Sequence, residues 1–253
     1  MRAADAAAVL DAGQARAADA GLKAMMPVHG RPFLDYVLSA LADAGITDAA
    51  LVVAPEHAAI RQHYERDFPP ARLRVSFVVQ RDARGTADAV VAAERWCADE
   101  PFLTLNADNL YPAGVLAGVV RLAEPGLPVF SSGDLVATGN IPAERIRAFA
   151  LVTVDEAGYL TGIIEKPQSR GAADQAHGIS MNCWRFDARI FAACRDVPRS
   201  ARGEYELPEA VGLAVARGVR FRCLPARGPV LDMSTRADAQ DVQRRLAGIT
   251  PAP

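Results

Sequence analysis

The stretch Phe102-Leu-Thr-Leu-Asn-Ala-Asp-Asn109 decides the fold class of this 253-residue chain. Its first four residues form an apolar run typical of a buried strand, and a polar turn follows directly. The preceding residues 87–97 predict a helix that Thr86 is suited to cap. Strands that alternate with helices are typical of a mainly parallel sheet, which binds ligands beyond the carboxyl ends of its strands. Asp108 is therefore expected at a ligand-binding edge.

The same alternation extends back toward the N-terminus. The predicted elements are a helix over 32–45, a strand over 49–54, a helix near 56–66 and a strand over 73–80. Pro32 suits the first turn of the first helix, and Gly45 suits its C-terminal end. Gln80 ends the last of these strands, so it is expected at the same edge of the sheet as Asp108.

After about residue 147 the pattern changes to antiparallel strands. Residues 149–155 and 159–165 flank a turn and predict a β-hairpin. The remaining predicted elements are strands over 180–186 and 219–224, helices near 187–196 and 206–217, a segment over 230–233 without an assigned structure, and a closing helix from Arg236. We expect one α/β domain over residues 1–253. It would contain a mainly parallel, Rossmann-like sheet with helices on both faces and an antiparallel hairpin subsheet in the second half.

Composition excludes several classes of protein. A formal net charge of -2 provides no broad positive field, so no nucleic-acid partner is expected. No apolar run approaches the roughly 20 residues of a membrane span, and the N-terminus lacks a secretory signal, so we expect a cytoplasmic protein without a membrane partner. The cysteines lack zinc-site spacing and are expected to be buried thiols: Cys97, Cys183, Cys194 and Cys223. The four histidines suggest no triad or metal cage, and both tryptophans are expected in the core.

Five segments, taken together and in order, resemble the sugar-nucleotide pyrophosphorylases of the nucleotidyltransferase family, including glucose-1-phosphate thymidylyltransferases and their uridylyl relatives. The segments are Lys23-Ala-Met-Met-Pro-Val-His-Gly-Arg-Pro32, Gln80 with Gly85-Thr-Ala-Asp-Ala-Val90, Leu105-Asn-Ala-Asp-Asn109, Ile163-Ile-Glu-Lys-Pro167 and Leu231-Asp-Met-Ser-Thr-Arg-Ala-Asp238. The resemblance implies an enzyme that joins a nucleoside triphosphate, UTP or dTTP, to a sugar 1-phosphate and releases pyrophosphate. It also implies a mainly nucleotide-binding half over 1–147 and a mainly sugar-phosphate-binding half over 148–253.

Such a transfer depends on positioning and charge neutralisation, because a sugar-phosphate oxygen attacks the α-phosphorus while pyrophosphate leaves. Mg²⁺ is the expected cofactor, with Asp108 and Asp232 as its candidate ligands, since magnesium takes one or two carboxylates and completes its shell with phosphates and water. Read without the resemblance, Asp108 is a turn residue and Asp232 a cap before the last helix.

The resemblance assigns further site residues. Lys23 would neutralise triphosphate charge, Glu165 would bind sugar hydroxyls, and Lys166 would bind the sugar phosphate. Gln80, Gly85 and Thr86 are the candidate nucleotide-binding residues, because an amide suits the edge of a pyrimidine and a glycine permits close approach to backbone. Asn182, expected inside a buried strand, would need a partner there, either a sugar hydroxyl or a backbone group.

Two segments depart from the family pattern. The N-terminal glycine-rich loop is degraded if Val9-Leu-Asp-Ala-Gly-Gln-Ala-Arg-Ala17 is aligned with it. We favour the alternative, in which Met1-Arg2 ends that loop, residues 3–20 form a helical insertion, and the first strand and loop precede Met1, leaving the sheet without a central strand. Phe149-Ala150 replaces the usual Tyr-Gly, which predicts a tighter sugar pocket.

Two rival functions stay open. One is a non-catalytic sugar-nucleotide-binding or regulatory protein that has lost the triphosphate loop. The other is a choline-phosphate or cytidylyl transferase on the same fold, which would keep the metal site and change the acceptor.

Overall fold

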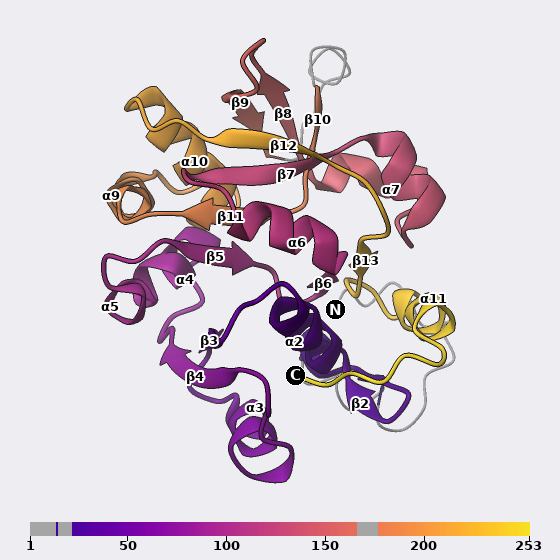
Figure 1. Cartoon of the computed structure of the whole chain (residues 1–253). Coiled ribbons are helices and arrows are strands. Elements are labelled where there is room, and N and C mark those ends of the chain that lie inside the picture. Colours follow the sequence, from indigo (N-terminus) through magenta and orange to yellow (C-terminus); the bar gives the residue numbers. More distant parts are fainter. Residues whose placement is uncertain (1–13, 15–21, 166–176) are drawn as a thin grey trace.

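The computed structural model describes residues 14, 22–165 and 177–253, and its largest sheet has seven strands. Six of them run in the order β5, β11, β7, β10, β8, β9, and β12 pairs with β7 (Figure 1). Their bounds are β5 Phe102–Leu105, β7 Gly126–Phe130, β8 Ala150–Val154, β9 Leu160–Ile164, β10 Gly178–Ser180, β11 Cys183–Phe186 and β12 Arg222–Ala226. Every pairing in this sheet is antiparallel except that of β7 with β12.

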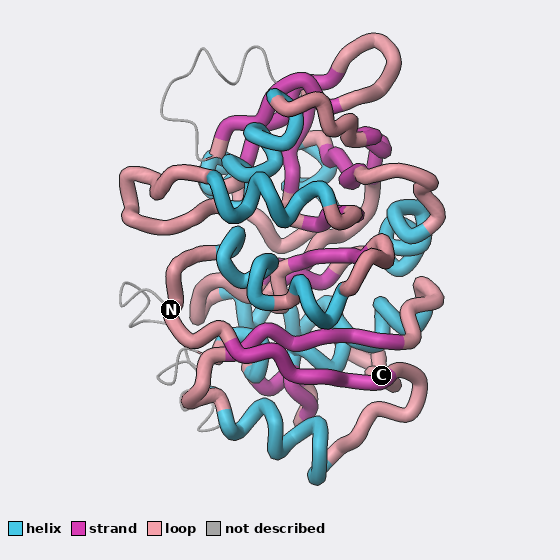
Figure 2. Tube along the Cα trace, turned by 90° about the vertical axis from the view of Figure 1, so that its left-hand side faces the viewer, coloured by secondary structure: helices cyan, strands magenta, loops and turns pink. Residues whose placement is uncertain are grey.

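The expectation of a mainly parallel sheet is not met among these residues. β3 (Asp48–Val53) and β4 (Arg74–Val79) do pair in parallel, but they form a separate two-stranded sheet. This pair lies apart from the seven-stranded sheet in two perpendicular views (Figure 1, Figure 2). The fold is therefore a mixed α/β arrangement, and the antiparallel strands extend beyond the predicted hairpin into the main sheet.

Helices cover the strands and connect the two sheets. The α-helices are α2 Phe33–Asp43, α3 Ala58–Gln62, α4 Thr86–Ala92, α5 Glu94–Cys97, α6 Ala113–Val120, α7 Ser132–Thr138, α9 Arg189–Asp196, α10 Leu207–Ala216 and α11 Asp238–Arg245. A π-helical turn, η2 His63–Asp67, continues α3, and two 3₁₀ helices are η1 Lys23–Met25 and η3 Ala143–Ala148. Two short antiparallel pairs complete the fold: β1 Pro27–Val28 with β2 Arg31–Pro32, and β6 Asn109–Leu110 with β13 Leu231–Asp232.

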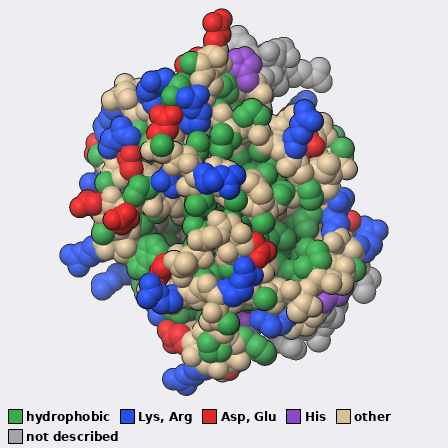
Figure 3. All heavy atoms as spheres, in the orientation of Figure 1, with side chains coloured by type: hydrophobic (Ala, Val, Ile, Leu, Met, Phe, Trp, Pro, Cys, Tyr) green, Lys and Arg blue, Asp and Glu red, His purple; other side chains and the backbone are tan. Residues whose placement is uncertain are grey.

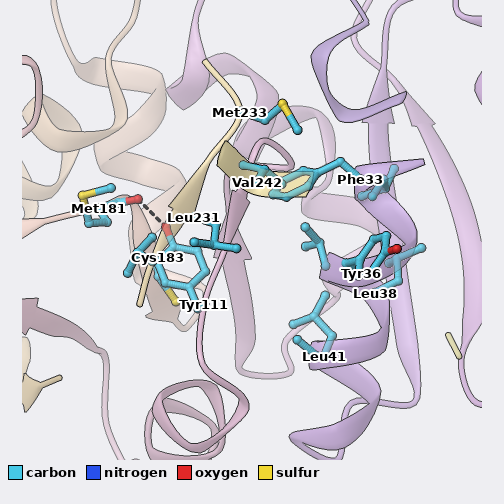
Figure 4. Close-up of a cluster of buried hydrophobic side chains, with 14 of the residues drawn as sticks. Phe33, Tyr36, Leu38, Leu41, Tyr111, Met181, Cys183, Leu231, Met233 and Val242 are labelled. Carbon is cyan, nitrogen blue, oxygen red and sulfur yellow. Dashed lines mark hydrogen bonds between the residues drawn. The ribbon is translucent and has the colours of Figure 1, made fainter. Parts of the chain in front are cut away.

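Apolar packing joins segments that are far apart in the sequence. One buried cluster centres on α2 and includes Tyr111, Leu231 and Val242 (Figure 4). Burying such side chains contributes about 1.5–3 kcal/mol each, so this cluster holds α2 against β6, β13 and α11. The four cysteines are free buried thiols and Trp184 is fully buried, as predicted. Trp96, by contrast, is 39% exposed, so its predicted place in the core was wrong.

An apolar cavity of about 910 Å³ separates β3 from β5, and we refer to it as the interstrand slot. Residues 45–53 line one wall and residues 100–107 line the other. Among the described residues no strand pairs with either of the two facing edges. Figure 3 shows hydrophobic side chains inside hollows on the face that it presents. The slot thus interrupts what would otherwise be one continuous sheet.

In the part of the chain that the structure describes, no helix combines the length and the apolar character needed to cross a membrane.

Candidate active site

The two carboxylates predicted to bind metal lie next to each other. In the antiparallel pair of β6 and β13, Asp232 is opposite Asn109, the residue that follows Asp108. Burial raises the pKa of Tyr111, and the negative charges of Asp108 and Asp232 raise it further. Its hydroxyl donates to the carbonyl of Met181 (Figure 4). The charges of both carboxylates therefore act on one buried tyrosine, although Asp108 lies in the middle of the sequence and Asp232 near its C-terminal end.

Lys23 lies at the same place. Its Nζ is 3.6 Å from Oδ2 of Asp108, and the side chains are 33% and 24% exposed. An exposed ion pair of this kind is weak, because water screens it and two side chains must be ordered. Lys23 is thus available to an anionic ligand. The whole sequence has 28 lysines and arginines, and only Lys23 and Lys166 are lysines; the other 26 are arginines.

The carboxylate of Asp232 is held from both sides. Its side chain is 1% exposed, Ser234 donates to Oδ1 over 2.5 Å, and Arg145 donates to Oδ2 over 3.0 Å. The Asn140 amide exchanges two hydrogen bonds with the Asp232 backbone, at 2.7 and 2.8 Å. The pKa of Asp232 is raised to about 6, chiefly because burial disfavours its charged form, while Ser234 and Arg145 act in the opposite direction.

The donor set suits magnesium in kind. Asp108 and Asp232 supply hard carboxylate oxygens, and two carboxylates suffice where phosphates and water complete the shell. No group of three or more metal-ligating side chains occurs among the residues described. A divalent ion here would be held by the two carboxylates, with phosphate oxygens and water as its other ligands.

The predicted base-binding residues lie before and at the start of α4, which packs on the segment before α10. Gln80 Nε2 donates to the carbonyl of Gly85 over 3.1 Å and to Asp88 over 2.8 Å. Gly85 has a φ of +121°, and a Cβ there would overlap the backbone of Tyr205. The close approach that this glycine permits is therefore already made by the chain itself.

Thr86 has a different structural role from the one predicted. Gly85 occupies the N-cap of α4, whereas Oγ1 of Thr86 accepts a hydrogen bond of 2.9 Å from the Leu207 N–H. Thr86 thus satisfies one of the free N–H groups at the start of α10. Thr86 and Leu207 also line the interstrand slot together with Asn106, near Asp108. Thr86 and the residues just before Asp108 consequently border one cavity.

The predicted sugar-phosphate residues are placed only in part. Glu165 follows β9, and Lys166 lies outside the described residues. Asn182 does not lie inside a strand as predicted: it separates β10 from β11, with a φ of +62°. Its side-chain oxygen accepts a hydrogen bond of 3.4 Å from Trp184, so its partner is an indole of the same chain.

Sequence reasoning missed two arginines near these groups. Arg145 belongs to residues 110–147, where no element had been predicted, and a lone arginine has no informative spacing. Arg202 donates to Glu206 over 2.5 Å. This bond is the main cause of the raised pKa of Arg202, and the charges of Glu204 and Glu165 add to it. Arg202 therefore brings a positive charge near Glu165.

Comparisons with known proteins identify the family of this chain. The profile of the family described as Nucleotidyl transferase matches residues 19–234. The UTP–glucose-1-phosphate uridylyltransferase AglF of Haloferax volcanii is 26% identical over 224 residues, 88% of this chain and 87% of that protein. A glucose-1-phosphate thymidylyltransferase of an Actinoplanes species is 30% identical over 217 residues, 85% of this chain and 68% of that protein.

Solved structures share the fold at low sequence identity. UTP-bound UGPase from Acinetobacter baumannii superimposes with a TM-score of 0.73 at 18% identity, covering 91% of this chain and 88% of that one. A UDP-glucose pyrophosphorylase complexed with UDP-glucose gives 0.72 at 16% identity, with 89% and 90% covered. With most of its length matched by the family profile, the chain belongs to the nucleotidyl transferase family.

Proposed function

We propose that this protein joins a nucleoside triphosphate, UTP or dTTP, to a sugar 1-phosphate and releases pyrophosphate. The observation that carries the proposal is the convergence of Lys23, Asp108 and Asp232 from three distant segments. The names of the similar proteins, a uridylyltransferase and thymidylyltransferases acting on glucose 1-phosphate, support this pair of substrate classes. In the reaction, a sugar-phosphate oxygen bonds to the α-phosphorus while the bond from that phosphorus to the bridging oxygen breaks.

The triphosphate end of the site is assigned to Lys23 and the two carboxylates. The Lys23 ammonium, shared with Asp108 in this structure, would turn to the triphosphate and neutralise part of its charge. Asp108 and Asp232 would hold Mg²⁺, which when bound supplies positive charge toward the phosphate oxygens. No nucleophile from the protein is needed, because the sugar phosphate supplies the attacking oxygen.

The remaining candidates are assigned to the base and the sugar. We propose that Gln80, Gly85 and Thr86 bind the base, since Thr86 borders the same cavity as the segment before Asp108. Glu165 and Lys166 would bind the sugar hydroxyls and the sugar phosphate, with Asn182 nearby as a polar group. Asp232 comes from the C-terminal half, so the proposed nucleotide half over 1–147 receives one residue from the sugar-phosphate half over 148–253.

Pyrophosphate release across a matrix of substrates tests the proposal. UTP, dTTP, CTP and ATP are each combined with glucose 1-phosphate, N-acetylglucosamine 1-phosphate and choline phosphate, with Mg²⁺ present. We expect release with UTP or dTTP and a sugar 1-phosphate, and none without the acceptor. Release only with CTP and choline phosphate would overturn the assigned substrates, and binding of UDP-sugar without any release would favour the non-catalytic rival.

A further inference from the structure

The guanidinium of Arg145 forms an ion pair with Asp232, one of the two carboxylates that the proposed function assigns to a metal ion. Its Nη2 is 3.0 Å from Oδ2 of Asp232, inside a region where the two side chains are 18% and 1% exposed. Ser234 occupies the other carboxylate oxygen over 2.5 Å. Both oxygens of Asp232 are therefore engaged by groups of the chain itself.

A second carboxylate keeps Arg145 in this position. Nη1 of Arg145 donates to both oxygens of Asp238, over 2.8 and 2.9 Å. Asp238 is itself fixed, because its Oδ2 accepts from the Thr235 N–H over 2.7 Å. The guanidinium thus bridges Asp232 and Asp238, and planar guanidinium groups hold such two-sided contacts more rigidly than an ammonium.

A metal ion and this guanidinium compete for the same charge. Mg²⁺ binds carboxylate oxygens at about 2.0–2.1 Å, so an ion on Asp232 would bring a second positive charge close to Arg145. Water screens such repulsion poorly at a buried position. Asp108, which is more exposed, faces Lys23 in the same way. Each carboxylate therefore already has a cationic partner within the protein.

We propose that Arg145 is a built-in competitor for divalent metal at Asp232, so that the free protein binds metal weakly and gains it together with a triphosphate. The triphosphate adds negative charge and oxygen ligands, which offset the repulsion, while Arg145 retains Asp238. This order of binding rests on the proposed function. The competition itself concerns the free protein and does not depend on turnover.

The competition can be tested without any substrate by measuring how tightly the free protein binds Mn²⁺. The electron paramagnetic resonance signal of unbound Mn²⁺ gives the amount bound. Arg145→Met removes the charge and keeps much of the stem, so we expect Mn²⁺ to bind about tenfold more tightly or better, equivalent to a gain of about 1.4 kcal/mol. Arg145→Lys retains a charge and is expected to stay close to wild type. Arg222→Met is the control, because Arg222 pairs with Glu124, outside the contacts of Arg145 with Asp232 and Asp238.

Asp238→Asn gives an independent result of opposite sign, which keeps the proposal testable if the Arg145→Met variant does not fold. Without its second carboxylate, Arg145 has Asp232 as its remaining anionic partner among these contacts, so Mn²⁺ should bind more weakly than to wild type. Unchanged or weaker Mn²⁺ binding by a folded Arg145→Met protein, or tighter binding by Asp238→Asn, would overturn the competition. Nucleotidyl transfer measured separately decides the proposed function, so the two failures are distinguishable.

Discussion

The main-chain N–H of Met233 donates to the carbonyl of Asp108 over 2.8 Å. This bond extends the pairing of β6 with β13, in which Asp232 faces Asn109. Two short strands thus hold the carboxylates of Asp108 and Asp232 side by side, and apolar neighbours such as Leu231 anchor the pair in the core. Because backbone hydrogen bonds determine this register, substitutions of the carboxylates are expected to change chemistry more than fold.

Asp108→Asn should abolish most of the nucleotidyl transfer. The change removes a negative charge while preserving shape, and the loss of one aligned charge at a reacting phosphate typically costs about 100-fold or more in rate. The 24% exposed side chain leaves room for the amide, so the melting temperature should barely change. Asp43→Asn, on an exposed carboxylate paired with Arg72, is the matched control and should retain wild-type rates. Turnover of the Asp108→Asn variant within a few-fold of wild type would remove Asp108 from the site.

The scarcity of lysine allows a direct labelling test of ligand binding. Lys23 and Lys166 are the two side-chain amines of the chain, so an amine-selective acylating reagent reports on the candidate site, with the α-amino group as internal reference. We expect UTP with Mg²⁺ to protect Lys23 and a sugar 1-phosphate to protect Lys166, as quantified by peptide mass spectrometry. If UTP binds and Lys23 acylates at an unchanged rate, the triphosphate assignment is wrong.

Elements with a strong local pattern were predictable from the sequence. The helix from Pro32 to Gly45 is confirmed as α2, because Gly45 adopts the left-handed conformation, with a φ of +91°, that ends such helices. The predicted hairpin is also confirmed, as the antiparallel pair of β8 and β9. It was predictable because an alternating pattern and a turn are both local signals that extend over a few residues. Pairings between distant strands were not predictable, because β5 pairs with β11 through contacts that no local period encodes.

The candidate site followed from the resemblance and not from residue patterns. An aspartate after an apolar run is compatible with a turn, so Asp108 and Asp232 were connected only by the order of the family segments. Arg145 was missed because its function arises from two carboxylates 87 and 93 positions away, Asp232 and Asp238. The interstrand slot likewise depends on where β3 and β5 lie in space, since each run alone predicts an ordinary strand.

Gly85→Ala should loosen the proposed base-binding loop. A Cβ at this position overlaps the Tyr205 backbone, and the φ of +121° is strained for alanine, so we expect a loss of about 2 kcal/mol or more in the free energy of unfolding. Gly45→Ala is the matched control, because its φ is also positive, at +91°, but a Cβ there meets no atom within 4 Å. Denaturant titration of the two variants separates backbone strain from the clash. Equal losses would show that the contact with Tyr205 contributes nothing.

Asp35 should make the stability of the protein depend on acid pH. Its fully buried carboxylate accepts hydrogen bonds from Arg31 over 2.6 Å and from Tyr64 over 2.8 Å, and Nε2 of His63 lies 3.3 Å away. Burial alone would raise the pKa of Asp35, but the hydrogen bonds with His63, Tyr64 and Arg31 outweigh it and lower the pKa below its ordinary value.

A carboxyl whose pKa is lower in the folded state stabilises the protein above its unfolded pKa of about 3.9, and this contribution is lost as the pH falls through the folded value. Asp35→Asn should therefore cost about 2 kcal/mol at neutral pH, and the difference from wild type should shrink below about pH 4. Urea denaturation across this pH range measures both quantities. Asp43→Asn on the same helix, where the Arg72 pair is exposed, should cost less than about 0.5 kcal/mol at every pH. A constant difference between wild type and the Asp35→Asn variant from neutral to acid pH would show that the ionised carboxylate of Asp35 does not stabilise the fold.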